Sequence, residues 1–209
     1  MNVLRLRTSP ARHMLQTLTA AALSLVLGTA AAASLADVRS AFNGLRDGKS
    51  SPDVAVAIVE DYLADNSGSP LAIAYMGSVR TIQGAKATTP WKRLAYIDKG
   101  FSLLDRAVAM LAASAPRVPD PVAVEVLLVS GITNASVPKL FKRRAAAQAN
   151  LESLLTRPDF EQLDGHSKAL VYAWLAVLTS AAQPLKGAIY LAHARRLNQQ
   201  LAEDIWSKR

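Results

Sequence analysis

The side chains that could carry out acid–base or metal chemistry are few, and they are spread along the chain. The sequence has three histidines, His13, His166 and His193, and no cysteine. No two histidines stand at the spacing that brings two imidazoles to one metal ion, and there is no thiol for a metal ligand or a disulfide. We therefore expect no metal site, no cofactor and surface positions for the histidines.

The carboxylates and hydroxyls give no stronger sign of catalysis. Asp98 and Asp105 lie two helical turns apart, roughly 10 Å, which is wider than the carboxylate pairs of glycosidases. The sequence has no Gly-x-Ser-x-Gly turn for a nucleophile and no glycine-rich phosphate loop. We expect that the protein is not an enzyme, since an enzyme would need His166 or His193 to meet a carboxylate or hydroxyl in a cleft.

The first 33 residues have the three parts of a secretory signal peptide. A basic start with three arginines is followed by an apolar run at 15–27 and then by small residues up to Ala33. The apolar run is shorter than the roughly 20 residues that span a bilayer. We expect cleavage after Ala33 and a single mature domain, 34–209, that works in the periplasm or is secreted and has no membrane span.

The charge of the mature chain is modest. The formal net charge is +8, and removal of the three arginines in the signal peptide leaves +5. Such a charge without dense basic clusters argues against nucleic-acid binding. The one tight basic cluster comprises Lys139, Lys142, Arg143 and Arg144. It is interpreted as a solvated helix start or, alternatively, as an anion-binding patch.

The three tryptophans have different sequence surroundings. Trp174 lies in an apolar helix and is expected in the core, whereas Trp206 lies near the basic C-terminal residues. Trp91 begins a predicted helix beside Lys92 and Arg93, and Trp and Arg are frequent at binding hot spots. Packing against the chain is the alternative for Trp91. The candidate partner-binding residues are Trp91, Lys92, Arg93, Lys139, Lys142 and Arg143.

The apolar periodicity predicts an all-α protein of about eight helices joined by short turns that carry proline or glycine. Ser69 and Pro70 are expected to cap and begin the third helix, and Asp53 to cap the second. Short connections make successive helices antiparallel neighbours, which predicts an α-solenoid. The predicted helices are at 35–46, 53–65, 70–85, 91–113, 122–135, 138–155, 168–182 and 186–206.

The segment 122–135 is ambiguous by itself. Val122, Val124, Val126 and Leu128 alternate as in a β-strand. The run is nevertheless long and apolar on both phases, and a single strand would have no pairing partner. A helix buried on more than one side is therefore predicted.

The pair of helices from Ala72 to Pro116 resembles the tetratricopeptide repeat. In that family an aromatic residue, a Leu-Gly pair, an alanine in the second helix and a closing proline recur. Here Tyr75 and Gly77 stand in the first helix, Leu104 and Ala107 stand in the second, and Pro116 follows. The segment is longer than the 34-residue repeat. Weaker echoes follow at 123–158 and 167–201. The resemblance implies that Tyr75, Gly77, Leu104 and Ala107 are repeat-packing positions and that a concave surface binds a peptide or protein.

These observations favour a non-enzymatic, exported helical-repeat scaffold that binds a protein or peptide partner in the cell envelope. The alternative is a periplasmic protein that binds a small ligand or an anionic polymer, since helix pairs can enclose a pocket and the chain is mildly basic.

Ala107 provides a test of the predicted helix pairing. A glutamate at this position would place an unpaired carboxylate between two packed helices, and Ala107→Glu is expected to lower the free energy of unfolding by several kcal/mol, roughly 3–5. Thermal unfolding followed by circular dichroism measures the change. A melting curve that matches the parent protein would contradict the placement of Ala107.

Overall fold

The computed structural model of the chain describes residues 32–111 and 120–208. The chain divides into two units, Met1–Ala31 and Ala32–Arg209, and everything below concerns the second. The predicted signal peptide therefore lies outside the described residues, apart from its last two. The predicted end of the helix at 91–113 and the closing Pro116 also lie outside them.

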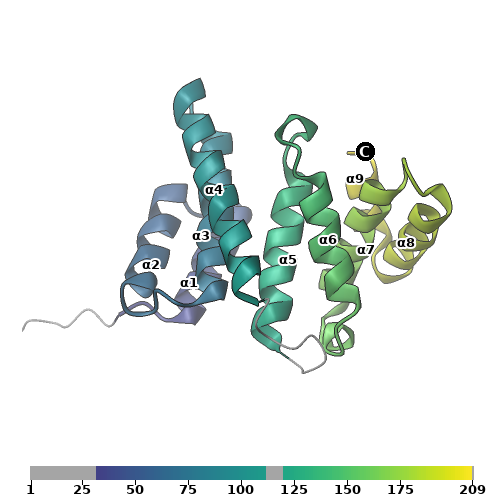
Figure 1. Cartoon of the computed structure of the whole chain (residues 1–209), viewed down its shortest axis with the longest axis horizontal. Coiled ribbons are helices and arrows are strands. Elements are labelled where there is room, and N and C mark those ends of the chain that lie inside the picture. The colour runs from purple at the N-terminus through teal and green to yellow at the C-terminus, as the bar shows by residue number, and fades with distance from the viewer. Residues whose placement is uncertain (1–31, 112–119, 209) are drawn as a thin grey trace, which may run out of the picture. The chain divides into compact units, whose positions relative to one another are not determined.

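The described residues form α-helices and short 3-10 turns without a β-strand, so the prediction of an all-α fold is confirmed. Figure 1 shows the helices side by side in hairpins that follow one another along the chain. The helices are α1 (Leu35–Arg46), α2 (Pro52–Asp65), α3 (Pro70–Lys86), α4 (Pro90–Met110), α5 (Pro121–Ser136), α6 (Arg144–Leu155), α7 (Gly165–Thr179), α8 (Pro184–Leu197) and α9 (Gln199–Trp206), with 3-10 turns η2 (Lys139–Phe141) and η3 (Phe160–Gln162).

Two helix starts show which residues act as N-terminal caps. The Ser69 hydroxyl accepts a hydrogen bond from the Ala72 amide, and Pro70 takes the first helical position, as predicted. The prediction that Asp53 caps α2 is wrong. Ser51 is the cap, and the Asp53 carboxylate instead accepts a hydrogen bond from the side chain of Gln83 on α3.

Two predicted helices have different bounds in the structure. The helix predicted from residue 138 begins at Arg144, because η2 and Lys142 precede it and Lys142 has a left-handed backbone with φ of 55°. The helix predicted at 186–206 is two helices. It breaks at Asn198, whose extended backbone leaves the helix and whose side chain caps α9 by accepting from the Leu201 amide.

The helices pack as hairpins α1–α2, α3–α4, α5–α6 and α7–α8, with α9 against α7 and α8. The first helices of successive hairpins also touch, so that α3 lies between α1 and α5, and α5 between α3 and α7. The prediction of a solenoid-like stack of neighbouring pairs is therefore right. The first helices form one continuous inner layer.

Glycine allows α3 and α4 to approach at backbone distance. A Cβ atom on Gly77 would lie 2.9 Å from the carbonyl oxygen of Gly100, and one on Gly84 would lie 2.9 Å from the carbonyl oxygen of Arg93. A Cβ on Gly100 would lie 2.7 Å from the carbonyl oxygen of Gly77. Real Cβ atoms are not found so close to backbone oxygen, so the observed spacing of the two helices requires glycine at these positions.

Helix α5 has two buried faces, which explains the ambiguous pattern of its sequence. Val126 and Val129 belong to the core of α1–α3, and Val124 and Leu127 belong to the core of α6–α9. Each pair is three residues apart and shares a helix face. The strand-like alternation therefore comes from a helix that lies between two cores.

The α3–α4 approach generates a prediction about Gly100. Gly100→Ala forces the two backbones apart or distorts them, and we expect it to lower the free energy of unfolding by about 1–3 kcal/mol. Gly165→Ala is the matched control, because a Cβ at Gly165 meets no atom within 4 Å. Urea unfolding of both variants measures the difference, and equal stabilities would contradict the close approach.

Candidate functional site

Three adjoining cavities lie along the layer of first helices. The largest of these three, of about 500 Å³, is lined from α1, α3, α5 and α7. A second of about 360 Å³ shares Glu125, Leu128 and Ser167 with it. A third of about 300 Å³ shares side chains of α1 and α5 with the largest. We call this continuous hollow the inner groove; its central residues are Phe42, Asn43, Arg46, Tyr75, Glu125, Leu128, Ile132, Thr133, His166, Ser167 and Leu170.

The inner groove combines apolar and polar side chains. Phe42, Leu128, Ile132 and Leu170 are partly buried and extend the two cores into the groove. The Phe42 ring also packs against the Tyr75 ring, with centroids 4.9 Å apart. Amide, hydroxyl and imidazole groups of other lining residues stand among them. Such a surface can hold a ligand that has both apolar side chains and hydrogen-bonding groups.

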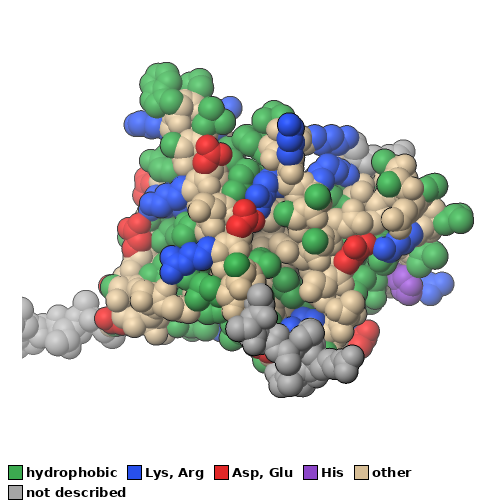
Figure 2. Space-filling view, viewed as in Figure 1, with side chains coloured by type: hydrophobic (Ala, Val, Ile, Leu, Met, Phe, Trp, Pro, Cys, Tyr) green, Lys and Arg blue, Asp and Glu red, His purple; other side chains and the backbone are tan. Residues whose placement is uncertain are grey.

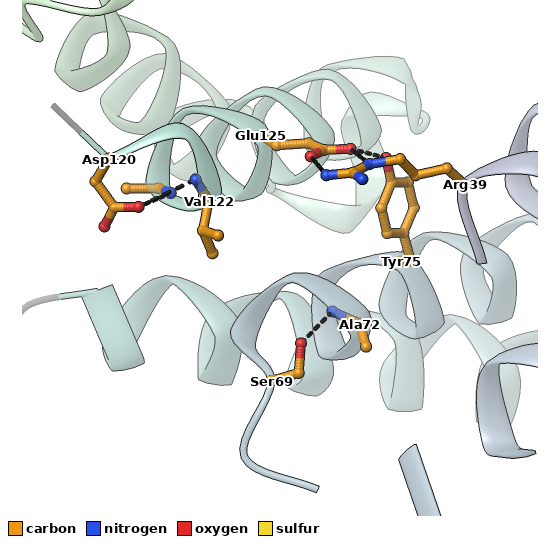
Figure 3. Close-up of polar contacts among 8 residues, drawn as sticks. Arg39, Ser69, Ala72, Tyr75, Asp120, Val122 and Glu125 are labelled. Atoms are coloured by element: carbon orange, nitrogen blue, oxygen red, sulfur yellow. Dashed lines mark hydrogen bonds and ion pairs between the residues drawn. The ribbon is translucent and has the colours of Figure 1, made fainter. Parts of the chain in front are cut away.

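A polar network joins side chains from three helices at the wall of the groove (Figure 3). The guanidinium of Arg39 donates to both carboxylate oxygens of Glu125, at 2.7 Å from Nε and 2.5 Å from Nη2. The Tyr75 hydroxyl donates to the same carboxylate. The network therefore ties α1 and α3 to α5 at the wall of the largest cavity.

The electrostatics of this network follow from burial and pairing. Burial, with the hydrogen bond to Glu125 as the second cause, raises the pKa of the Tyr75 phenol above its ordinary range. The hydrogen bonds to Glu125 raise the pKa of the Arg39 guanidinium. Tyr75 therefore stays a neutral donor and Arg39 a cation at any physiological pH. A second polar contact between α3 and α5 is the 2.8 Å hydrogen bond between the hydroxyls of Ser78 and Thr133.

Reasoning from the sequence missed the inner groove. Glu125 carried a usable signal, because it is the one charged residue in the apolar run from Pro121 to Ile132. A carboxylate in a helix that is buried on two sides needs a partner. The sequence does not identify that partner, because Arg39 lies 86 residues away.

The residues predicted to bind a partner lie outside the inner groove. Trp91, Lys92 and Arg93 are exposed at the N-terminal end of α4. Lys139 and Lys142 are exposed in the connection between α5 and α6. The structure brings these two groups to neighbouring hairpin ends and not into the groove.

Arg143, the sixth predicted residue, makes contacts within the chain. Its guanidinium pairs with Asp105, donates to the Asn134 side chain at 2.9 Å, and lies 4.7 Å from the centre of the Phe101 ring. These contacts join α4, α5 and α6. Arg144 also donates to the carbonyl oxygen of Val177. The basic cluster expected from the sequence is therefore divided: Arg143 and Arg144 make contacts within the chain, whereas Lys139 and Lys142 are exposed.

The four predicted repeat-packing residues are buried. The position of Gly77 faces Leu104 across the α3–α4 contact, and Ala107 is fully buried one turn further along α4. Tyr75 packs on Phe42 and has the additional role of lining the groove and donating to Glu125.

The two histidines of the described chain do not meet. His166 is exposed at the N-terminal end of α7 and lines the largest cavity, whereas the ring of His193 stacks on Tyr172, with centroids 5.0 Å apart. In the described ranges, no group of three or more His, Asp or Glu side chains is arranged to hold a metal ion.

Comparisons with protein-family models, with curated proteins and with solved structures find no match for this chain. The class that its geometry defines is a solenoid-like stack of α-helical hairpins with a groove along its first helices. The groove and the surface of the hairpins are therefore the features of the described chain that point to a function.

The Arg39–Glu125–Tyr75 network generates a prediction about stability. Glu125→Ala leaves the buried Tyr75 hydroxyl without its acceptor and Arg39 without its partner, and we expect a loss of about 2–3 kcal/mol. Glu203→Ala is the control, since Glu203 pairs with Arg195 on the surface, where such pairs contribute at most about 1 kcal/mol. Urea unfolding of the variants, with Tyr75→Phe to complete a double-mutant cycle, measures the coupling; additive effects would contradict the network.

Proposed function

We propose that the protein is a non-enzymatic scaffold of the cell envelope whose inner groove binds an extended segment of a protein partner. The observation that carries the proposal is the continuity of the groove across α1, α3, α5 and α7. Four adjacent helices at 8–10 Å spacing cover roughly 30 Å. An extended peptide rises about 3.3 Å per residue, so such a groove holds about nine residues.

The chemistry of the groove suits a peptide. Partly buried Leu128, Ile132 and Leu170 can cover apolar side chains of a ligand. Asn43 and Ser167 offer amide and hydroxyl groups that can pair with peptide backbone. A peptide needs both kinds of contact along its length, because its backbone amides lose water on binding.

The charge of the groove supports this proposal over an anionic polymer. Arg39 is paired with Glu125, and Arg46 has the carboxylate of Asp47 at 3.5 Å. An anionic chain in the groove would lie against carboxylates as well as guanidiniums and would gain little net attraction.

The resemblance to the tetratricopeptide repeat and the predicted signal peptide support the rest of the proposal. The family resemblance rests on Tyr75, Gly77, Leu104 and Ala107, and it implies a concave surface that binds a peptide or protein. The signal peptide predicted at 1–33 indicates that the protein acts in the periplasm or outside the cell.

Site-specific photo-crosslinking in the envelope of the producing cell tests the proposal. A photoreactive residue in place of Asn43, which is exposed in the groove, is expected to form a discrete protein adduct. The same residue in place of Asp65, which is exposed on α2 outside the groove, is the control. A third probe in place of Trp91 asks whether the hairpin end contacts the same partner.

A substitution in the lining of the groove tests whether formation of the crosslinked adduct depends on the groove. Leu170→Glu removes apolar lining from the groove and is expected to reduce the Asn43 adduct more than about tenfold, the equivalent of 1.4 kcal/mol. Leu197→Glu, on an exposed position of α8, is expected to leave it unchanged. If Leu170→Glu lowers the melting temperature, the exposed Arg46→Glu replaces it. Adducts that form equally from Asn43 and Asp65 would contradict a binding role for the groove.

A further inference from the structure

Three hairpin ends each present one large apolar side chain to solvent. Trp91 is 70% exposed, Leu140 is 72% exposed and Leu185 is 82% exposed, and these are the three most exposed large hydrophobic residues in the described part of the chain. Each follows closely on a proline that begins a helix or turn: Pro90, Pro138 and Pro184. A single exposed apolar residue is ordinary on a protein surface, so what indicates a contact surface is the place that these three share.

The three ends lie at one edge of the stack of hairpins. The C-terminal halves of α1, α3 and α5 line one cavity together, so these first helices run in the same direction. Phe141 of η2 packs against Phe101 of α4, with ring centroids 5.8 Å apart. Arg144, where α6 begins, donates to the carbonyl oxygen of Val177 near the end of α7. Figure 1 shows the upper ends of α4 and of the α5–α6 connection on the same side.

Basic residues flank the exposed apolar residues, and carboxylates are sparse. Lys92 and Arg93 follow Trp91, and Lys139 and Lys142 enclose Leu140. Across residues 32–111 and 120–208, none of these four has a carboxylate oxygen within 4.0 Å of a charged nitrogen. The sequence has no acidic residue at 66–97 or at 126–151. Figure 2 shows basic and apolar side chains together over the upper end of α4.

The backbone of Lys142 adds an independent observation. Its φ of 55° lies in the left-handed region, where glycine fits without strain and a lysine costs about 1 kcal/mol or more. Within the described residues it is the one residue other than glycine with positive φ. Lys142 is the C-cap of η2, where its amide donates to the carbonyl oxygen of Lys139, and this turn leaves its side chain exposed beside Lys139 and Leu140.

We propose that this edge of the stack, the tip edge (Trp91, Leu140 and Leu185 with Lys92, Arg93, Lys139 and Lys142), docks on a lipid surface that carries anionic headgroups. Tryptophan favours the interface between headgroups and hydrocarbon, and leucine adds apolar area there. Lysine and arginine near such a surface are each attracted to anionic lipid. None of the described helices is long and apolar enough to cross a membrane.

The spacing of the apolar residues favours lipid over a protein partner. The three apolar side chains stand on three separate hairpin ends, one to each end. Protein interfaces concentrate their binding energy in one central, well-packed patch. Separate anchors with basic residues beside them instead suit a fluid surface, which adapts to each anchor independently.

Partition into lipid vesicles tests the proposal. The protein is purified as the producing cell leaves it, its N-terminus is determined by mass spectrometry, and it is sedimented with vesicles of phosphatidylcholine with or without roughly one-third phosphatidylglycerol at about 0.1 M salt. We expect partition into the vesicles that contain phosphatidylglycerol and weak partition into neutral ones. Binding that is equal for both vesicle types would overturn the role of the basic residues.

Charge reversal separates the tip edge from the general charge of the chain. Lys92→Glu, Lys139→Glu and Lys142→Glu together are expected to lower partition at least about tenfold. The matched control changes net charge equally at other exposed positions: Lys99→Glu, Arg106→Glu and Arg196→Glu. Comparable losses in the two triple variants would overturn the proposal, because they would show attraction without a specific edge.

A separate variant tests the three exposed apolar residues of the tip edge. Trp91→Ala, Leu140→Ala and Leu185→Ala together are expected to lower partition about tenfold, whereas Val122→Ala with Leu197→Ala, at the opposite helix ends, leaves it unchanged. Brominated lipid is expected to quench the fluorescence of the parent protein and to lose that effect in Trp91→Phe. All variants replace exposed residues, so melting temperatures should match the parent protein.

The outcomes distinguish this proposal from the peptide groove. Leu170→Glu is expected to abolish the Asn43 adduct and leave vesicle partition unchanged, and the tip-edge variants are expected to do the reverse. Absence of vesicle binding together with a protein adduct from the Trp91 probe would overturn lipid docking and assign the tip edge to a protein partner.

Discussion

The burial of α5 on two opposite faces is the constraint on which the rest of the described structure depends. Val126 and Val129 close the core of α1–α3, and Val124 and Leu127 close the core of α6–α9. One helix therefore belongs to both cores and holds the hairpins before and after it in register. The same helix lines all three cavities of the inner groove. A change that rotates α5 would therefore alter stability and groove together.

The close packing of each hairpin leaves the first helices free to form a surface. Gly77, Gly84 and Gly100 bring α3 and α4 to backbone contact, so α3 is buried on that side and meets α1 and α5 on its flanks. The polar side chains of α3 are divided between its two neighbours: Arg80 and Gln83 bond Glu60 and Asp53 of α2, and Tyr75 and Ser78 face α5. Tyr75 donates to Glu125 and Ser78 bonds Thr133, so polar contacts between first helices stand where a ligand would lie. Groove and tip edge are then separate surfaces of one scaffold, one for a peptide segment and one for a lipid surface, as proposed above.

Local residue chemistry made much of the helical fold predictable. Ser69 and Pro70 begin α3 as predicted, because the serine caps the helix and the proline takes its first position. Helix α1 has the predicted bounds, Leu35–Arg46. The errors arose where two local signals compete. Ser51, and not Asp53, caps α2, because Pro52 takes the first helical position and Asp53 already lies within the helix, where its carboxylate accepts from Gln83. Asn198 breaks the last predicted helix in two, although the apolar periodicity continues through it.

The sequence by itself determined the all-α class, the hairpin order and two small residues of the α3–α4 contact, Gly77 and Ala107, because caps, turns and apolar periodicity are local properties. Tertiary structure alone decided the candidate site. Arg39, Tyr75 and Glu125 are far apart in the chain and meet because α1, α3 and α5 lie side by side. Tertiary structure also places Arg143 in contact with Asp105 and Phe101, outside the predicted basic patch. It brings the exposed side chains of Trp91, Leu140 and Leu185 to one edge of the stack of hairpins. These placements depend on which helices pack together. Contacts between residues that are dozens of positions apart in the chain produce no periodic pattern in the sequence.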